Sequence, residues 1–474
     1  MSRLTNIGNS MKNILSSKLT DVNGSKNVII LYIFTLIVVF LGTSKSIFSV
    51  YMPDDYLLAS TQMPISFYLN QGRFIQAITT MWFNHSNINV ISASSIFTPV
   101  FIMLVAGAAS IFVYLLADRK VSLLFGCLLS AVIACHPAFS MMAVYHMSTM
   151  LFSISAACFC AYMIYFDKYS VDSSLSLLAV TTLLVVVMCG TYQPFFVAII
   201  IFTASYILIK GNFTLSIKNI MKVAPVVVGL ILYMIIFKIT KNLAGHNDWD
   251  NRAGLLTNIP ERIHEVINFL PSLFFRDWWL ITWQFSAMLS ICMLAAFITF
   301  IFSQKRTGIV LRIILSGFVF AITILPIAIL KDWDPSSRAM FSVSFSYAVV
   351  MIVFFNEKII KTKCVVMGLA VLLGLISSNH YLYTVEMDQK GDEAMVQTVY
   401  GMLSTTNLEG KEVSIVNNQS IKVAQWALNG IFYFNTGKNF NIVGPSEVDV
   451  QKCASQDVKP SLVQYDNKVV ICLN

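Results

Sequence analysis

Long apolar stretches separated by short polar segments dominate this sequence. Eleven of them lie near the ~20 residues that a helix needs to cross a bilayer, although several are short or interrupted. They are residues 28–48, 97–117, 121–137, 147–166, 174–190, 195–209, 223–240, 279–302, 309–330, 340–355 and 364–380. The pattern predicts a polytopic α-helical membrane protein with about 11 transmembrane helices.

Composition supports the same class. Of the 474 residues, 57% are hydrophobic and only 12% are charged, and the mean hydropathy is +0.72. Soluble globular domains carry about 25% charged residues, so this class is excluded. The first 27 residues are polar and lack the apolar core of a signal peptide. We therefore expect residues 1–27 to be a cytoplasmic N-terminal segment.

The distribution of positive charge predicts the orientation. If the N-terminus is inside, 16 of the 32 Lys and Arg residues fall in short inner segments and 8 in short outer loops. This bias agrees with the positive-inside rule, and an odd number of spans places the C-terminus outside. The net charge of +8 is explained by these inner segments. No nucleic-acid partner is therefore expected.

Most of the polar residues that suggest a site lie on the predicted outer side. All six histidines fall in outer loops or at outer span ends, and none has the spacing of metal ligands, so no metal site is predicted. The working face is expected outside, where no ATP or nucleotide sugar is present. The membrane part comprises residues 28–380, with long outer loops at 49–96 and 241–278 and a compact one at 331–339.

The first outer loop contains the most distinctive pair, Asp54 and Asp55. Two adjacent carboxylates at a membrane surface are costly, because desolvation and mutual repulsion disfavour charging both. One interpretation is a helix cap after Pro53. The other is a general base for a hydroxyl group. We expect one aspartate to cap and the other to act chemically, with Tyr56 as a neighbouring substrate contact.

Two outer arginines are candidate phosphate ligands. Arg73 follows the pair by one short predicted helix, and Arg338 lies in KDWDPSSRAM together with Asp334. A guanidinium grips phosphate with two donors. Alternatively, Arg73 contacts lipid headgroups, and Arg338 pairs with Asp54 or Asp55. We favour the phosphate for Arg338.

Three further residues are candidate sugar contacts. Tyr192 and Gln193 occupy a very tight outer turn, where the glutamine must find a partner inside the bundle because lipid supplies none. That partner is either a sugar hydroxyl or the helix end freed by Pro194. Trp278 belongs to an aromatic cluster after a predicted interfacial helix at 259–275, which is broken at Pro271. Such residues serve as membrane-belt anchors or stack on sugar rings.

The tail, residues 381–474, changes character. It is polar, and EVSIVN and LVQYDNKVVICL alternate as strands do, so we predict a small α/β domain outside the membrane. Cys453 and Cys472 are the two cysteines of this tail. Since the outer compartment of the predicted topology is oxidising, we expect a disulfide between them.

These motifs carry a resemblance to a known family. MPDDY and QGR in the first outer loop, TYQP, PSSRAM and GDEAMVQ resemble the O-antigen glucosyltransferases of the GtrII type, within the GT-C class. Each motif is short, and the likeness covers most of the chain in plan. The resemblance implies a multi-pass protein of the bacterial inner membrane with a periplasmic C-terminal domain. It also implies transfer of glucose from polyprenyl phosphate-glucose to the O-antigen of lipopolysaccharide, which changes the serotype.

The resemblance fits the chemistry of the outer residues. Asp54 or Asp55 would be the base, Arg73 and Arg338 would hold the phosphate, and the class implies a single displacement with inversion. The donor, the O-antigen acceptor and membrane lipid are the expected partners, and a flippase and a donor-making glucosyltransferase are candidate partner proteins. The residues require no cofactor, and the resemblance leaves a divalent metal open.

Two rival functions remain. A polyprenyl-linked sugar flippase or transporter would show mid-span charges and internal repeats, which are scarce here. An O-antigen polymerase or ligase would usually carry arginine-rich outer loops, whereas the acidic pair is the more prominent feature here.

The charge bias predicts that the N-terminus lies inside and the C-terminus outside. A reporter that is active only in the periplasm should be silent when fused after Lys210 and active when fused after Asn474. Silence at Asn474 in a stable fusion protein would contradict this topology.

Overall fold

The computed structural model describes most of the chain after the N-terminal segment. The described residues are 25–47, 50–60, 63–86, 88–89, 91–117, 122–214, 216–245, 256, 258–279, 281–302, 308–355, 360–416, 427–456, 460–465 and 467–473. The predicted cytoplasmic segment 1–27 and the polar stretch 246–255 therefore lie largely outside the described residues.

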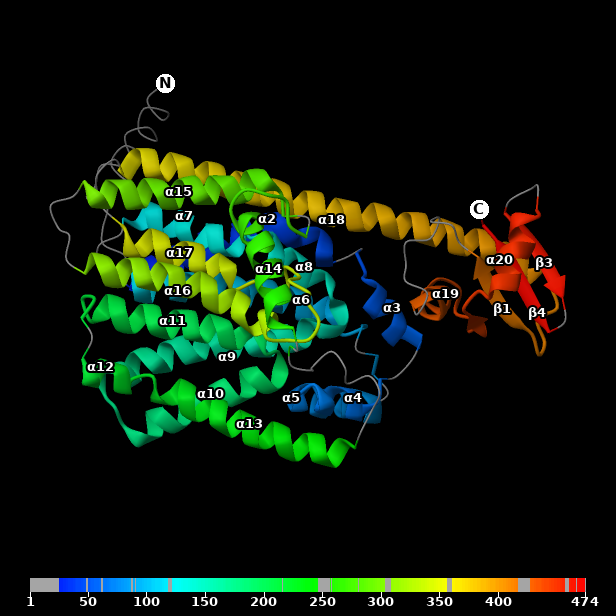
Figure 1. The fold of residues 1–474 in the computed structure, drawn as a ribbon, viewed down its shortest axis with the longest axis horizontal. Coiled ribbons are helices and arrows are strands. Elements are labelled where there is room, and N and C mark those ends of the chain that lie inside the picture. Colours follow the sequence, from blue (N-terminus) through cyan, green and yellow to red (C-terminus); the bar gives the residue numbers. More distant parts are fainter. Residues whose placement is uncertain are drawn as a thin grey trace, which may run out of the picture.

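Every predicted apolar stretch contains a helix, and these helices form a bundle (Figure 1). They are α2 (Ser25–Thr43), α6 (Ser94–Leu116), α7 (Leu123–Ala134), α9 (His146–Val171), α10 (Leu175–Thr191), α11 (Pro194–Lys210), α13 (Ala224–Ala244), α15 (Trp283–Ile301), α16 (Ile309–Ala328), α17 (Val343–Val353) and α18 (Ile360–Ser404).

Length and composition separate these helices into groups. Among the described residues, seven are long and apolar enough to cross a membrane. An eighth span results if α7 and α8 (Pro137–Val144), which meet at 45°, count as one. Helices α10, α11 and α17 are shorter and apolar. The chain is therefore a polytopic membrane protein, and eleven spans remain a prediction.

Some of the short helices lie together at one end of the bundle. Helices α3 (Pro53–Ser60), α4 (Ile65–Asn70) and α5 (Phe74–His85) lie at the end from which α18 projects (Figure 1). The predicted helix at 259–275 is α14 (Ile259–Phe269), followed by the 3₁₀ helix η3 (Leu270–Leu273), which contains Pro271. The other short elements are η1 (Ser44–Ile47) and α12 (Ile217–Met221).

Helix α18 differs from the expected organisation. It has 45 residues and continues through residue 381, where the sequence predicted the start of a separate domain. A change from apolar to polar side chains decides whether a helix lies in lipid or in water, but it does not break the backbone hydrogen bonds that form the helix. The helix therefore extends from the bundle toward the strands without a linker (Figure 1).

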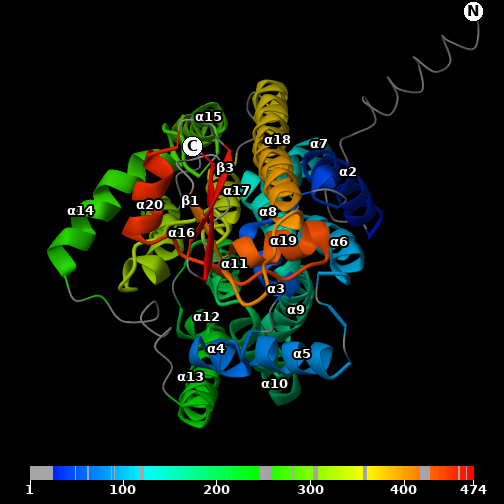
Figure 2. The ribbon, with the colours of Figure 1, turned by 90° about the vertical axis from the view of Figure 1, so that its right-hand side faces the viewer.

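The remaining chain forms a mixed sheet, called the C-terminal unit together with its two helices. Its strands are β1 (Glu412–Val416), β2 (Ile442–Val443), β3 (Ser461–Tyr465) and β4 (Lys468–Cys472), in the order β2-β1-β4-β3. Strand β1 is parallel to β2 and β4, and β3 is antiparallel to β4. Its helices are α19 (Leu428–Thr436) and α20 (Glu447–Ala454). In the view from the side of the C-terminal unit, α19 and α3 lie next to each other across the end of the bundle (Figure 2).

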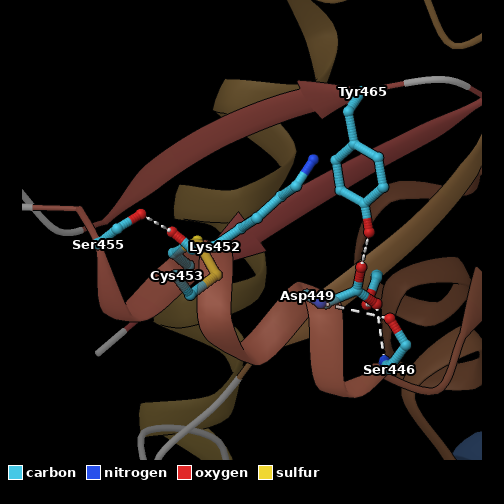
Figure 3. The surroundings of a disulfide bond; sticks show 8 residues. Ser446, Asp449, Lys452, Cys453, Ser455 and Tyr465 are labelled. Carbon is cyan, nitrogen blue, oxygen red and sulfur yellow. Dashed lines mark hydrogen bonds between the residues drawn. A yellow bond between two sulfur atoms is a disulfide. The ribbon is translucent and has the colours of Figure 1, made fainter.

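A buried carboxylate organises the α20 side of this unit (Figure 3). Asp449 accepts hydrogen bonds from the Ser446 backbone, the Ser414 hydroxyl, Lys468 Nζ and the Tyr465 hydroxyl. Burial alone would raise the pKa of Asp449, but these hydrogen bonds hold it well below its usual range. The ionised carboxylate therefore ties α20 to β1, β3 and β4.

The sulfur atoms of Cys453 and Cys472 form a disulfide beside this carboxylate. Their Cα atoms are 5.2 Å apart, within the range that a disulfide can bridge. The bond joins α20 to the end of β4 across 19 residues of sequence. In the chain-entropy model a closed loop of this size stabilises the folded state by about 3 kcal/mol.

We expect this bond to persist in the protein isolated from membranes. The denatured protein should label at seven cysteines before reduction and at all nine afterwards. The Cys453→Ser variant should label at eight in both conditions, which identifies the partner. Labelling of all nine native cysteines without a reductant would show that the bond does not form.

Candidate functional site

The carboxylate of Asp55 is buried and holds helix α3 in place. Its residue is 1% exposed, and its oxygens accept backbone hydrogen bonds from Met52 at 3.0 Å and Met147 at 2.8 Å. Burial raises the pKa of Asp55 to about 7, although backbone hydrogen bonds from Met52, Met147 and His146 oppose the shift. Through these hydrogen bonds Asp55 links α3 to the start of α9.

A second tie lies next to the first. The imidazole Nε2 of His146 donates to the Val50 carbonyl at 2.7 Å, and the Tyr51 ring lies 4.9 Å from the imidazole ring. His146 is buried. Its ring therefore supports the segment that enters α3 and is a hydrogen-bonded polar group.

Asp54 differs from its neighbour in exposure. Its side chain is 38% exposed, and its Oδ2 lies 3.9 Å from Nη1 of Arg338, at the outer limit of an ion pair. An ion pair this long and this exposed contributes little to stability. Both side chains also remain partly exposed to solvent, because 31% of the Arg338 side chain is exposed as well.

Arg338 is held from several sides. Its guanidinium lies 4.0 Å from the Tyr145 ring centroid, and its carbonyl accepts a hydrogen bond from the Tyr192 hydroxyl at 3.4 Å. Burial alone would lower the pKa of Arg338, but the surrounding Tyr145, Tyr192, Asp54 and Asp334 outweigh it and raise the pKa. The exposed Asp334 thus belongs to the surroundings of this arginine.

Arg73 reaches the same place from the turn between α4 and α5. Gly72, with φ of +73°, makes this turn, and a Cβ there would lie 2.4 Å from the Tyr233 hydroxyl. Both the positive φ and the close approach require glycine. The Arg73 guanidinium then lies 5.7 Å from the Tyr192 ring centroid.

Gln193 joins this turn to the bundle. Its Oε1 accepts from Arg73 Nε at 3.4 Å, while its Nε2 donates to the Gln71 carbonyl at 2.6 Å and to the Tyr233 hydroxyl at 3.3 Å. These partners lie in the first outer loop and on α13 and not at the helix end freed by Pro194, and a contact with a sugar hydroxyl stays a prediction. Its role in the structure is to orient Arg73.

The two arginines give the site a positive character. Burial lowers the pKa of Arg73, and the neighbouring Arg338 cation lowers it further, against the opposite effect of Tyr192. Among the described residues, no carboxylate lies within ion-pair distance of Arg73. Two guanidinium groups with a single weak carboxylate contact suit an anion such as a phosphate.

The described residues contain no group of three or more His, Cys, Asp or Glu side chains that could hold a metal ion. The cluster contains the guanidinium groups of Arg73 and Arg338, with the carboxylates of Asp54 and Asp334 near Arg338.

Two sequence candidates lie away from this cluster. Tyr56 is 1% exposed and packs into the core of the C-terminal unit with Ile431 and Phe432, so its side chain does not face Asp54's surroundings. Trp278 is 6% exposed, and its Nε1 donates to the Pro335 carbonyl at 2.7 Å. It supports the loop that carries Arg338 and offers no open ring face for a sugar.

Other residues, which the sequence did not single out, contact Arg338, Gln193 and the loop that carries Arg338. Tyr145 stacks on Arg338, and Tyr233 contacts Gln193. Arg262 on α14 donates to the Lys331 carbonyl at 2.7 Å and lies 5.1 Å from the Trp333 ring centroid. The only sequence signal for Tyr145 was its place in an outer turn, and Tyr233 lies within an apolar stretch, so neither could be distinguished from core residues.

Fold and site together define a polytopic membrane protein with a cationic site at one end of its helix bundle. The family model of the glucosyl transferase GtrII matches residues 46–357, about two thirds of the chain. The chain therefore belongs to the GtrII glucosyl transferase family, and it is a glycosyltransferase. A search of curated protein sequences gives no match. The matched range contains Asp54, Arg73 and Arg338 but ends before α18 and the C-terminal unit.

The different positions of the two aspartates predict different effects on stability. Replacing Asp55 by Ala removes the acceptor of two backbone N–H groups and should lower the free energy of unfolding by about 1–3 kcal/mol. Asp54→Ala is the matched control, and its effect should be smaller, because the Asp54 side chain is 38% exposed and that of Asp55 is buried. Thermal unfolding in detergent measures both.

The pH dependence provides a further check on Asp55. Because its folded pKa of about 7 exceeds the unfolded value of about 3.9, its contribution to stability falls as the pH rises between these values. The stability advantage of the native protein over Asp55→Asn should therefore be larger at pH 5 than at pH 8. Equal differences at both pH values would contradict the buried, shifted carboxylate.

Proposed function

We propose that this protein is a membrane glucosyltransferase that moves glucose from polyprenyl phosphate-glucose to the O-antigen of lipopolysaccharide. The reaction takes place on the periplasmic face of the bacterial inner membrane and converts the serotype. The observation that carries the proposal is the position of Arg338 beside both the half-exposed Asp54 carboxylate and the second cation, Arg73, at one end of an apolar helix bundle.

The two arginines bind the donor phosphate. A guanidinium presents planar donors that match phosphate oxygens, and such charge-assisted hydrogen bonds are stronger than neutral ones. Arg338 has one long contact with Asp54, and Arg73 is oriented by Gln193. Both can therefore turn to an incoming phosphate without breaking a strong ion pair. The lipid tail of the donor stays among the apolar helices and the surrounding bilayer.

Asp54 is the base in the transfer step. An acceptor hydroxyl oxygen attacks the anomeric carbon of glucose while the bond from that carbon to the phosphate oxygen breaks. The hydroxyl proton passes to the Asp54 carboxylate, and the electron pair of the broken bond leaves on polyprenyl phosphate. The arginines neutralise the charge that develops on this phosphate. A single displacement inverts the anomeric configuration.

A lipid-linked donor fits the side of the membrane that the charge bias predicts for the site. The charge bias predicts that the site end of the bundle faces the periplasm, where nucleotide sugars are not supplied. A donor carried by a lipid reaches this face within the membrane. A donor-making glucosyltransferase and a flippase would then be the partner proteins that supply it.

The proposal predicts separate kinetic signatures for the base and the arginines. Asp54→Asn should lower kcat by about 100-fold or more, because the base is lost. Arg73→Ala and Arg338→Ala should chiefly raise the KM for the lipid donor, and Lys at either position should restore activity only in part, since the planar fork is missing. Steady-state assays with separately varied donor and acceptor measure these effects.

Asp332→Asn is the matched control, because this exposed carboxylate lies in the same loop as Arg338. Its kinetics should resemble those of the native protein. Full activity of Asp54→Asn at normal expression would exclude the base, and an arginine effect confined to the acceptor would exclude the phosphate assignment.

A further inference from the structure

Helix α3 also contacts the C-terminal unit. Tyr56 is among the largest fully buried side chains and packs in one cluster with Val396 of α18 and with Ile431 and Phe432 of α19. Figure 1 shows α3 between the bundle and α19. Tyr56, two positions after Asp54, therefore belongs to the core of the C-terminal unit.

The contact between α3 and α19 is made at backbone distance. A Cβ atom added to Gly430 would lie 1.9 Å from the Tyr56 carbonyl oxygen and 2.8 Å from the Leu57 nitrogen. Backbone atoms cannot rotate away as a side chain can. Because it has no side chain, Gly430 allows α19 to pack directly against the backbone of α3, the helix that carries Asp54.

Further contacts hold the segment that enters α3. The Tyr51 backbone N–H donates to Gln389 Oε1 of α18 at 2.9 Å. The Phe434 ring of α19 lies 4.9 Å from the Tyr51 ring and 5.5 Å from the Tyr56 ring. Both the start of α3 and its first turn are thus fixed by α18 and α19.

This support matters because α3 is short. It has eight residues, and a helix of this length is not stable by itself in water, so its position depends on packing. A displacement of about 1 Å of a catalytic group can cost about 100-fold in rate. The position of the Asp54 carboxylate relative to Arg338 therefore depends on how α3 packs against α19.

We propose that the C-terminal unit is a positioning clamp for the Asp54 helix, with Gly430 as its contact point. The clamp acts on the site of the proposed glucosyl transfer and rests on that function. It assigns a role to the part of the chain beyond the family match, which ends at residue 357. Gly430, Tyr56 and Phe434 are positioning residues, because they act on the reaction only through α3.

The first test is Gly430→Ala, with Gly444→Ala as the matched control. Gly444 belongs to the same unit, and a Cβ there meets no atom within 4 Å. Gly430→Ala should lower kcat by about tenfold or more and change the donor KM by less than about twofold, whereas Gly444→Ala should behave as the native protein. Unchanged kcat in Gly430→Ala would overturn the clamp.

A measurement that does not depend on activity accompanies the kinetics. Hydrogen exchange of a peptide that contains residues 53–60 should become faster in Gly430→Ala and remain native-like in Gly444→Ala. If the native protein transfers no glucose, the proposed function fails, and this exchange comparison still decides whether the clamp exists. Native exchange in Gly430→Ala would refute the clamp whatever the activity.

A second pair of variants covers the case in which Gly430→Ala does not fold. Tyr56→Phe keeps the ring and removes a hydroxyl that has no hydrogen-bond partner among the described residues, so it should keep native kcat and exchange. Phe434→Ala removes the ring between Tyr51 and Tyr56 and should lower kcat and speed exchange in α3. A loss of donor or acceptor affinity in Tyr56→Phe would instead show a substrate contact and overturn the clamp, as would native behaviour of Phe434→Ala.

Discussion

The site depends on one interaction, the buried carboxylate of Asp55 that accepts the backbone N–H groups of Met52 and Met147. This contact joins the eight-residue helix α3 to the start of α9, one of the long apolar helices of the bundle. The N–H groups and the carboxylate are removed from water together, so each would be costly if the other were missing. The tie therefore fixes a short element that has little stability of its own.

Helix geometry then explains why two adjacent aspartates have different roles. Successive residues of an α-helix point about 100° apart, so neighbours cannot share one face. Asp55 points to α9, Asp54 lies toward Arg338, and Tyr56 is buried against α19. Three consecutive residues thus connect the bundle, the cationic cluster and the C-terminal unit. Any shift of the helix alters all three contacts together.

The sequence predicted the elements better than it predicted their partners. The length of the apolar stretches identified the long helices, because a helix that crosses a membrane needs about 20 consecutive apolar residues. The alternation of apolar and polar residues at 412–416 and 468–472 agrees with strands β1 and β4. The roles of Tyr56 and Trp278 could not be inferred, because burial against a distant segment leaves no local pattern. The sequence left open how the two aspartates divide their roles, since Asp55 accepts a hydrogen bond from the N–H of Met147, 92 residues away.

The central claim is that glucose reaches this site on a lipid phosphate. The most direct measurement is glucose transfer to O-antigen by the purified protein in lipid vesicles, with either polyprenyl phosphate-glucose or a nucleotide-linked glucose as the labelled donor. The account predicts labelled O-antigen and released polyprenyl phosphate with the first donor, and no transfer with the second. Transfer from the nucleotide-linked donor in the absence of the lipid donor would contradict it.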